Sequence, residues 1–64
     1  MVEVGEIYQH KEYGTIYSIT EVSQNDYCKC KLLYTNSCKE DVGMFFGNIN
    51  GKLFENDVYR RVDD

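Results

Sequence analysis

Three cysteines and the single histidine are the residues of this chain that could bind a metal or act in covalent chemistry. Cys28, Cys30, Cys38 and His10 would supply the four ligands of a Cys₃His zinc site. Zinc sites usually take two cysteines from a C-x₂₋₄-C knuckle, whereas a single residue separates Cys28 from Cys30. On a strand their Cα atoms would be roughly 6.6 Å apart, while two sulfurs on one zinc lie within about 4.6 Å. We therefore interpret Cys28 and Cys30 as small core hydrophobes and expect no metal and no cofactor.

A catalytic pair of Cys38 and His10 is the second possibility. A nucleophilic cysteine needs a lowered pKa, a base within reach and a pocket. A chain of 64 residues buries only about 60% of the surface that its unfolded form exposes, which leaves little room for a pocket. We expect that the protein is not an enzyme, and that His10 makes a structural hydrogen bond near a strand end.

Charge and composition exclude several classes of protein. Seven Lys and Arg against eleven Asp and Glu give a net charge of −4, whereas nucleic-acid binding usually leaves a basic footprint. No apolar run approaches the ~18 residues of a membrane span, and the first residues lack the pattern of a signal peptide. An odd number of cysteines is not typical of a secreted disulfide scaffold. We expect a cytoplasmic protein with reduced thiols and no membrane association.

The composition and the turn residues indicate a small all-β domain. The chain has no Pro and no Ala, six Tyr and three Phe, and turn residues recur every eight to twelve positions. We expect one domain over residues 1–64, with strands over 6–10, 15–22, 27–34, 39–43 and 57–62. Strict alternation along 27–34 predicts Cys28, Cys30, Leu32 and Tyr34 on the core face, and Tyr27, Lys29, Lys31 and Leu33 toward solvent. In the last strand, Val58 and Val62 are expected to point inward.

Residues 44–49 have two interpretations. They could extend the fourth strand into a hairpin closed by Asn50-Gly51, a strong hairpin signal. Alternatively, residues 44–48 form one helical turn, with Met44 and Phe45 closing the end of a barrel. Five short strands with one such turn near residues 44–48 predict a five-stranded SH3-like barrel. An OB-fold is the second choice, and a three-stranded sheet with one helix is the third.

The chain also resembles a family of small bacterial and phage proteins of unknown function. Residues 5–19 resemble the opening of that family, which places Gly, Tyr or Trp, His, Lys, Gly and Tyr in this order. The segments 31–34, 44–46, 50–52 and 58–62 look like its later motifs, although residues 40–43 lack its Trp-x-Arg-Pro. The resemblance implies an SH3-like barrel, favours the helical turn at 44–48, and implies a phage or prophage origin. It implies no activity.

The aromatic residues carry the functional expectation. Six Tyr and three Phe exceed what one thin core can bury, and Tyr is enriched at interaction hot spots. We expect a non-enzymatic interaction module, for which a phage origin would imply a host protein whose activity the module modulates or inhibits. The alternative for most of these tyrosines is that they close the two ends of the barrel. The candidate partner-binding residues are Tyr8, Tyr13, Tyr17, Tyr27 and Tyr59.

A second functional hypothesis is a small nucleic-acid-binding barrel. Tyr27, Lys29 and Lys31 share one face of the predicted strand 27–34. Aromatic and basic side chains on such a face can stack on bases and contact phosphates. The alternative is that the two lysines only solvate an outer strand face.

Overall fold

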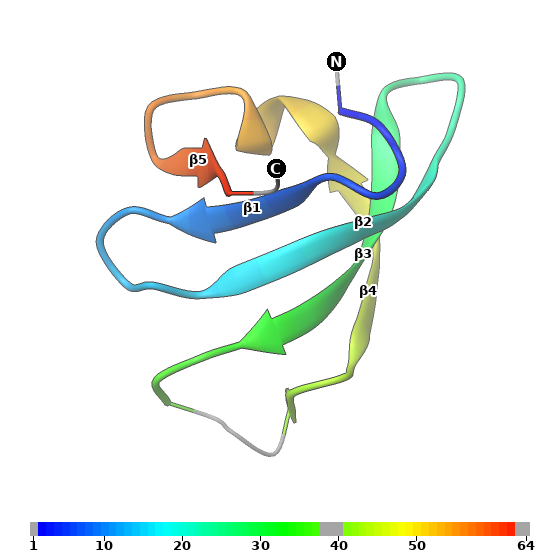
Figure 1. Ribbon diagram of the computed structural model, residues 1–64. Coiled ribbons are helices and arrows are strands. Elements are labelled where there is room, and N and C mark those ends of the chain that lie inside the picture. The colour runs from blue at the N-terminus through cyan, green and yellow to red at the C-terminus, as the bar shows by residue number, and fades with distance from the viewer. Residues whose placement is uncertain (1, 38–40, 63–64) are drawn as a thin grey trace.

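The computed structural model describes residues 2–37 and 41–62. Five antiparallel strands form one sheet in the order β4-β3-β2-β1-β5. Figure 1 shows how strongly this sheet bends, with the turn η2 leading from β4 back toward β5. This is the all-β, SH3-like barrel that the sequence predicts. The elements are β1 (Ile7–His10), β2 (Ile16–Val22), β3 (Tyr27–Tyr34), β4 (Phe45–Asn50), the 3-10 turn η2 (Gly51–Phe54) and β5 (Tyr59–Arg61).

Two tight turns connect the first three strands. Gly14, with φ of 75°, ends the β1–β2 turn, and its amide donates to the His10 carbonyl at 2.9 Å. The β2–β3 turn closes through the Ser23 amide and the Tyr27 carbonyl at 2.7 Å, with Asp26 at φ of 62°. Asp is one of the few residues that tolerate this left-handed conformation.

No helix among the described residues is long and apolar enough to cross a membrane.

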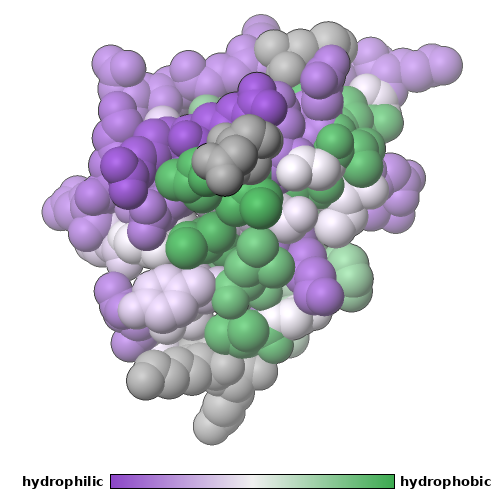
Figure 2. Space-filling model, in the orientation of Figure 1, coloured by the Kyte–Doolittle hydropathy of each residue, from purple (hydrophilic) through white to green (hydrophobic). Residues whose placement is uncertain are grey.

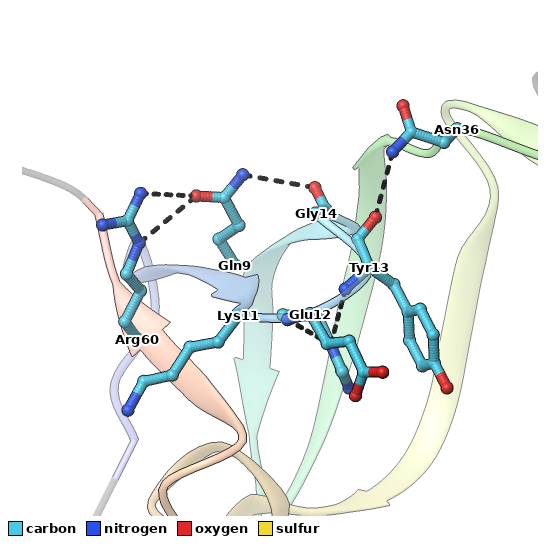
Figure 3. Close-up of a pocket in the computed structure, with 8 residues that line it drawn as sticks. Gln9, Lys11, Glu12, Tyr13, Gly14, Asn36 and Arg60 are labelled. Carbon is cyan, nitrogen blue, oxygen red and sulfur yellow. Dashed lines mark hydrogen bonds between the residues drawn. The ribbon is translucent and has the colours of Figure 1, made fainter.

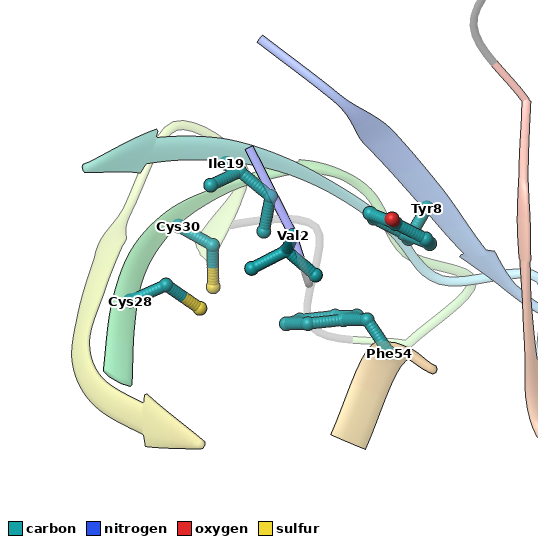
Figure 4. Close-up of a cluster of buried hydrophobic side chains, with 6 residues drawn as sticks. All are labelled: Val2, Tyr8, Ile19, Cys28, Cys30 and Phe54. Atoms are coloured by element: carbon teal, nitrogen blue, oxygen red, sulfur yellow. The ribbon is translucent and has the colours of Figure 1, made fainter. Parts of the chain in front are cut away.

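The core lies on the inner side of the bent sheet and is covered by η2. Figure 4 shows side chains from the N-terminal segment, β1, β2, β3 and η2 converging on one cluster. Cys28, Cys30 and Leu32 are buried, which confirms the predicted core face of β3 over most of its length. The cluster consists of Val2, Tyr8, Ile19, Cys28, Cys30 and Phe54.

The prediction that Tyr34 belongs to this core face was wrong, because Tyr34 is 45% exposed. Tyr17 pairs with Leu32, but the next residue of β2, Ile16, pairs with Tyr34. Leu33 is therefore an extra residue in β3, and such a bulge breaks the strict alternation of inward and outward side chains.

The helical turn expected at residues 44–48 is instead a strand, and the turn begins at Gly51. Phe45, Phe46 and Ile49 are residue types that favour a pleated surface. The side chain of Asn50 accepts from the Lys52 amide at 3.0 Å and so caps the turn after the strand. Residues 39 and 40 of the expected strand 39–43 lie outside the described residues. Its remaining residues, 41–43, form a turn in which the Met44 amide donates to the Asp41 carbonyl.

The orientation expected for the last strand was wrong by one residue. Val58 and Val62 are exposed, and β5 comprises only Tyr59–Arg61. Pairing with β1 places Tyr59 opposite His10 and Arg61 opposite Tyr8. Tyr59 therefore packs against the core cluster in place of the two valines.

Candidate binding site

The barrel is open between its two edge strands. β4 and β5 lie at opposite ends of the strand order, so they do not pair with each other in the described part of the chain. A hollow of about 80 Å³ lies between them and η2, which we call the seam hollow. Its lining carries no charged side chain among the described residues and consists of Tyr17, Cys30, Phe46, Ile49, Leu53, Phe54 and Tyr59.

The register of the sheet explains why these side chains meet. Tyr17 pairs with Leu32 on one side and with Tyr8 on the other, and both of these partners are buried. On β4, Phe46 lies opposite Cys30 and Ile49 lies opposite Cys28. Opposed residues of antiparallel strands share one face. The sheet therefore turns Tyr17, Phe46 and Ile49 to the inner side.

Aromatic rings form most of the wall of the seam hollow. The ring of Tyr17 lies edge-on to Phe46 and to Phe54, with centroids 6.1 Å apart in each pair. The ring of Phe54 also lies edge-on to that of Tyr59, with centroids 5.0 Å apart. Edge-to-face pairs of this kind are each worth about 0.5–1.5 kcal/mol beyond their buried area. The rings therefore pack against one another around the hollow.

Two residues that line the seam hollow, Tyr17 and Tyr59, carry phenol hydroxyls. Burial raises the pKa of Tyr17, and it raises the pKa of Tyr59 as well. Both hydroxyls therefore keep their protons and can donate a hydrogen bond. Within residues 2–37 and 41–62, no hydrogen bond is made by either hydroxyl. The two groups are thus available to a bound partner.

The cysteines that the structure describes are core residues. Burial raises the pKa of the Cys30 thiol to about 11, with a smaller effect of the neighbouring Cys28, and it also raises the pKa of Cys28. A thiolate is the form that attacks electrophiles and binds metals, so both residues are held in their less reactive form. Cys38, the third ligand of the hypothetical zinc site and the hypothetical nucleophile, lies outside the described residues. Among the described residues, no three His, Cys, Asp or Glu side chains are grouped as metal ligands.

The five candidate tyrosines separate into three environments. Tyr17 and Tyr59 come together at the seam hollow, where their ring centroids are 6.4 Å apart. Tyr8 is buried in the core cluster and donates to Glu6 Oε1 at 2.9 Å, so it does not line the seam hollow. Tyr13 and Tyr27 are exposed, but neither lines the seam hollow.

Sequence reasoning missed Phe46, Ile49 and Leu53 as site residues. Phe46 and Ile49 share the inner face although they are three positions apart, which an alternating pattern does not predict. Gly47 and Asn48 together lie opposite Lys29, and Asn48 has φ of 57°. This bulge could be suspected only from the Gly-Asn pair.

His10 organises a second, wider hollow at the β1–β2 turn (Figure 3). Its Nδ1 accepts from the amides of Glu12 at 3.1 Å and Tyr13 at 3.0 Å, which confirms the expected structural hydrogen bond. The neutral ring then carries its proton on Nε2. The ring stacks on Tyr13 with centroids 4.5 Å apart and meets Tyr59 edge-on at 5.0 Å.

Several polar side chains of this wider hollow, of about 530 Å³, make hydrogen bonds to one another or to the backbone of the β1–β2 turn. Figure 3 shows Arg60 donating to Gln9 Oε1 from two nitrogens, at 2.9 and 3.3 Å. Gln9 in turn donates to the Gly14 carbonyl, and Asn36 donates to the Tyr13 carbonyl. We therefore interpret these side chains as groups that stabilise the β1–β2 turn.

The proposed nucleic-acid face of β3 contains an additional aromatic residue. The Lys31 Nζ lies 5.7 Å from the ring centroid of Phe45, which is 65% exposed. Lys29 Nζ lies 3.6 Å from Glu21 Oε2, so its charge is partly offset. Tyr27 is exposed at the start of the same strand. The face therefore combines one partly neutralised lysine, one lysine over an aromatic ring, and two exposed rings.

Hydrophobic side chains also reach the outer surface of the sheet. Figure 2 shows them gathered in the middle of the face presented in Figure 1, over β1 and β2, with hydrophilic residues around them. Ile7 and Ile16 are half-buried on these strands. The seam hollow differs from this surface because it is concave.

Comparisons with known proteins add nothing to this geometry, since the chain matches no family model and neither a curated protein nor a solved structure is significantly similar to it.

Proposed function

We propose that this protein is a non-enzymatic binding module that docks a partner protein at the seam hollow. One observation carries the proposal: a concave hollow without charged side chains is lined by two tyrosines, and neither of their hydroxyls makes a hydrogen bond within the described residues. Binding sites are typically concave and mostly apolar, with a few polar groups that fix orientation. Tyr also supplies contact area at a low cost in conformational entropy.

The partner in this proposal is a host protein. The resemblance to small bacterial and phage proteins supports this part, and for a phage-encoded protein it implies action in the cytoplasm of the host cell. A barrel of 64 residues can cover a site on a larger protein more readily than it can enclose a substrate. The module would act by covering such a site and so changing the activity of its partner.

Capture from a bacterial lysate tests the proposal when it includes a matched pair of variants. Leu53 lines the seam hollow and Val58 does not, yet both are 44% exposed. Leu53→Glu and Val58→Glu therefore add the same charge at equal exposure, and circular dichroism would verify that both variants fold. We expect a protein that is retained by the wild type and by Val58→Glu and lost with Leu53→Glu. Equal retention by Leu53→Glu would overturn the proposal.

A second candidate function is binding of single-stranded nucleic acid through Tyr27, Lys29 and Lys31. The position of Lys31 over the exposed ring of Phe45 favours it, because a ring and a cation together suit a base and its phosphate. The net charge of −4 opposes it. Titration of a fluorescent single-stranded oligonucleotide at several salt concentrations tests this candidate. Phosphate contacts would make the affinity fall steeply with salt, and Lys31→Gln would reduce that slope.

A further inference from the structure

We infer that the seam hollow binds one aliphatic side chain of an extended partner segment, with basic residues on either side of it. This inference rests on the proposed function, because it specifies what enters the same hollow. The size of the hollow, the interrupted edge of β4 and the charge of the chain each contribute to it.

The size and the walls of the hollow define the inserted group. A volume of about 80 Å³ is far below the roughly 300–1,000 Å³ of sites for small molecules and cofactors. It suits a single side chain of medium size. Phe46, Ile49 and Leu53 offer only carbon atoms to such a group. An aliphatic side chain gains most there, since about 0.8 kcal/mol accompanies each buried methylene.

The edge of β4 argues against a partner that adds a regular sixth strand. Residues 45–50 carry no charged side chain. A regular edge strand without charges would be open to the addition of another strand. However, the bulge at Gly47 and Asn48 inserts an extra residue opposite Lys29 and bends the edge. β5 offers only three residues. The partner backbone therefore lies at the mouth of the hollow and does not form a ladder of β-sheet hydrogen bonds with β4 or β5.

Tyr17 and Tyr59 supply the polar contacts of this mode of binding. Their hydroxyls are protonated donors that make no hydrogen bond within the described residues. The backbone of an extended segment presents carbonyl groups on both sides of each side chain. One inserted side chain thus brings acceptors close to the two phenols.

Charge selects the residues that flank the inserted side chain. The lining of the hollow contributes no charge, so the flanking residues experience the field of the whole chain, which carries −4. A negative field attracts cationic segments and repels acidic ones. Lysine or arginine on either side is therefore favoured over aspartate or glutamate.

Three capped peptides test this inference on the full chain by NMR titration at low salt. Acetyl-Lys-Leu-Lys-amide should shift the methyl signals of Leu53 and Ile49 in a saturable way. Acetyl-Lys-Ala-Lys-amide should bind at least about tenfold more weakly, because three carbons no longer enter the hollow. Acetyl-Glu-Leu-Glu-amide should bind several-fold more weakly, and that difference should shrink with added salt.

Variants that lack one hydroxyl test the polar contacts. Tyr17→Phe and Tyr59→Phe should each weaken the leucine peptide about two- to tenfold, the range of one hydrogen bond. Tyr27→Phe is the matched control, because Tyr27 does not line the hollow, and it should leave the affinity unchanged. All three variants should keep the thermal unfolding midpoint of the wild type to within a few degrees.

The outcomes separate this inference from the proposed function. Equal binding of the alanine and leucine peptides, or tighter binding of the acidic peptide, would overturn the inference even if Leu53→Glu abolishes capture from lysate. The converse outcome is selective binding of the basic leucine peptide while Leu53→Glu leaves capture unaffected. That result would support the inference about what the hollow binds and would reject the proposed function. Shifts confined to residues outside the hollow would contradict the inference and leave the capture experiment to decide the proposed function.

Discussion

Tyr17 and Tyr59 lie with their ring centroids 6.4 Å apart although their strands, β2 and β5, are not neighbours in the sheet. Both strands pair with β1, and the bend of the sheet brings their inner faces together. The ring of Phe54 in η2 packs against both tyrosine rings, with its centroid 6.1 Å from that of Tyr17 and 5.0 Å from that of Tyr59. The shape of the seam hollow therefore depends on where η2 sits.

Gly51, the first residue of η2, should not tolerate a side chain. A Cβ at this position would lie 2.9 Å from both the carbonyl oxygen and Oδ1 of Asp26, and 3.1 Å from Val2 Cγ2. We expect Gly51→Ala to lower the free energy of unfolding by about 1–3 kcal/mol, as overpacking does. Gly47→Ala is the control, because its Cβ would approach only the Lys29 side chain, at 3.8 Å. Thermal unfolding that ranks Gly47→Ala as the more damaging change would contradict the packing described for η2.

Glu6 should contribute more to stability than its ion-pair partner Arg61. Glu6 is buried and accepts from the Glu3 amide at 2.7 Å and the Tyr8 hydroxyl at 2.9 Å, and its Oε2 lies 3.0 Å from Arg61 Nη1. Glu6→Gln should cost about 1–3 kcal/mol, because it weakens charge-assisted hydrogen bonds inside the protein. Arg61→Gln should cost less than about 1 kcal/mol, because the arginine side chain is largely exposed. Denaturant titration of the two variants measures the difference, and the reverse order would refute this account.

The positions of the tyrosines predict a clear ranking of alanine variants. Tyr8→Ala should cost about 3–5 kcal/mol, as large aromatic truncations in a core do. Tyr34→Ala should cost far less, since the side chain is exposed and its hydroxyl donates to Asn36, two residues along the chain. Thermal unfolding distinguishes the two variants. A larger loss for Tyr34→Ala than for Tyr8→Ala would mean that the bulge at Leu33 is misplaced.

The raised pKa of Cys30 predicts a loss of stability in alkali. The folded protein holds this thiol proton up to about pH 11, whereas the unfolded chain releases it near 9.0. The resulting stabilisation is present below about pH 9 and is lost as the pH rises through about 11, by an amount of the order of 2 kcal/mol. Urea unfolding between pH 8 and 11.5 should show this decline. The decline should be shallower in Cys30→Ala, and an identical slope would exclude Cys30 as its cause.

The fold could be predicted from the sequence where alternation and turn residues agree. Cys28, Cys30 and Leu32 follow a strict period of two, and Gly14 sits where the first turn needs φ of 75°. The error at Tyr34 and the unpredicted placing of Phe46 and Ile49 on one face have one physical cause. Bulges at Leu33 and at Gly47 and Asn48 shift the register, and periodicity cannot show an extra residue.

The candidate site was only partly predictable. Tyr17 and Tyr59 were expected to bind a partner, and they line the seam hollow. Their convergence depends on strand order and on the bend of the sheet, which no local pattern encodes. Leu53 follows Asn50-Gly51, a pair that is typical of a hairpin turn. In the structure this pair begins a 3-10 turn, and that turn brings Leu53 to the hollow.

Photo-crosslinking with photo-leucine, a diazirine analogue of leucine, tests most directly whether the partner docks at the seam. The chain contains three leucines: Leu32 is buried, whereas Leu33 and Leu53 are similarly exposed, at 38% and 44%. Leu53 lines the seam hollow and Leu33 does not, so the chain carries its own control. After irradiation with the captured partner, peptide mass spectrometry should locate the crosslinks at position 53. Crosslinks at position 33, with none at 53, would contradict docking at the seam.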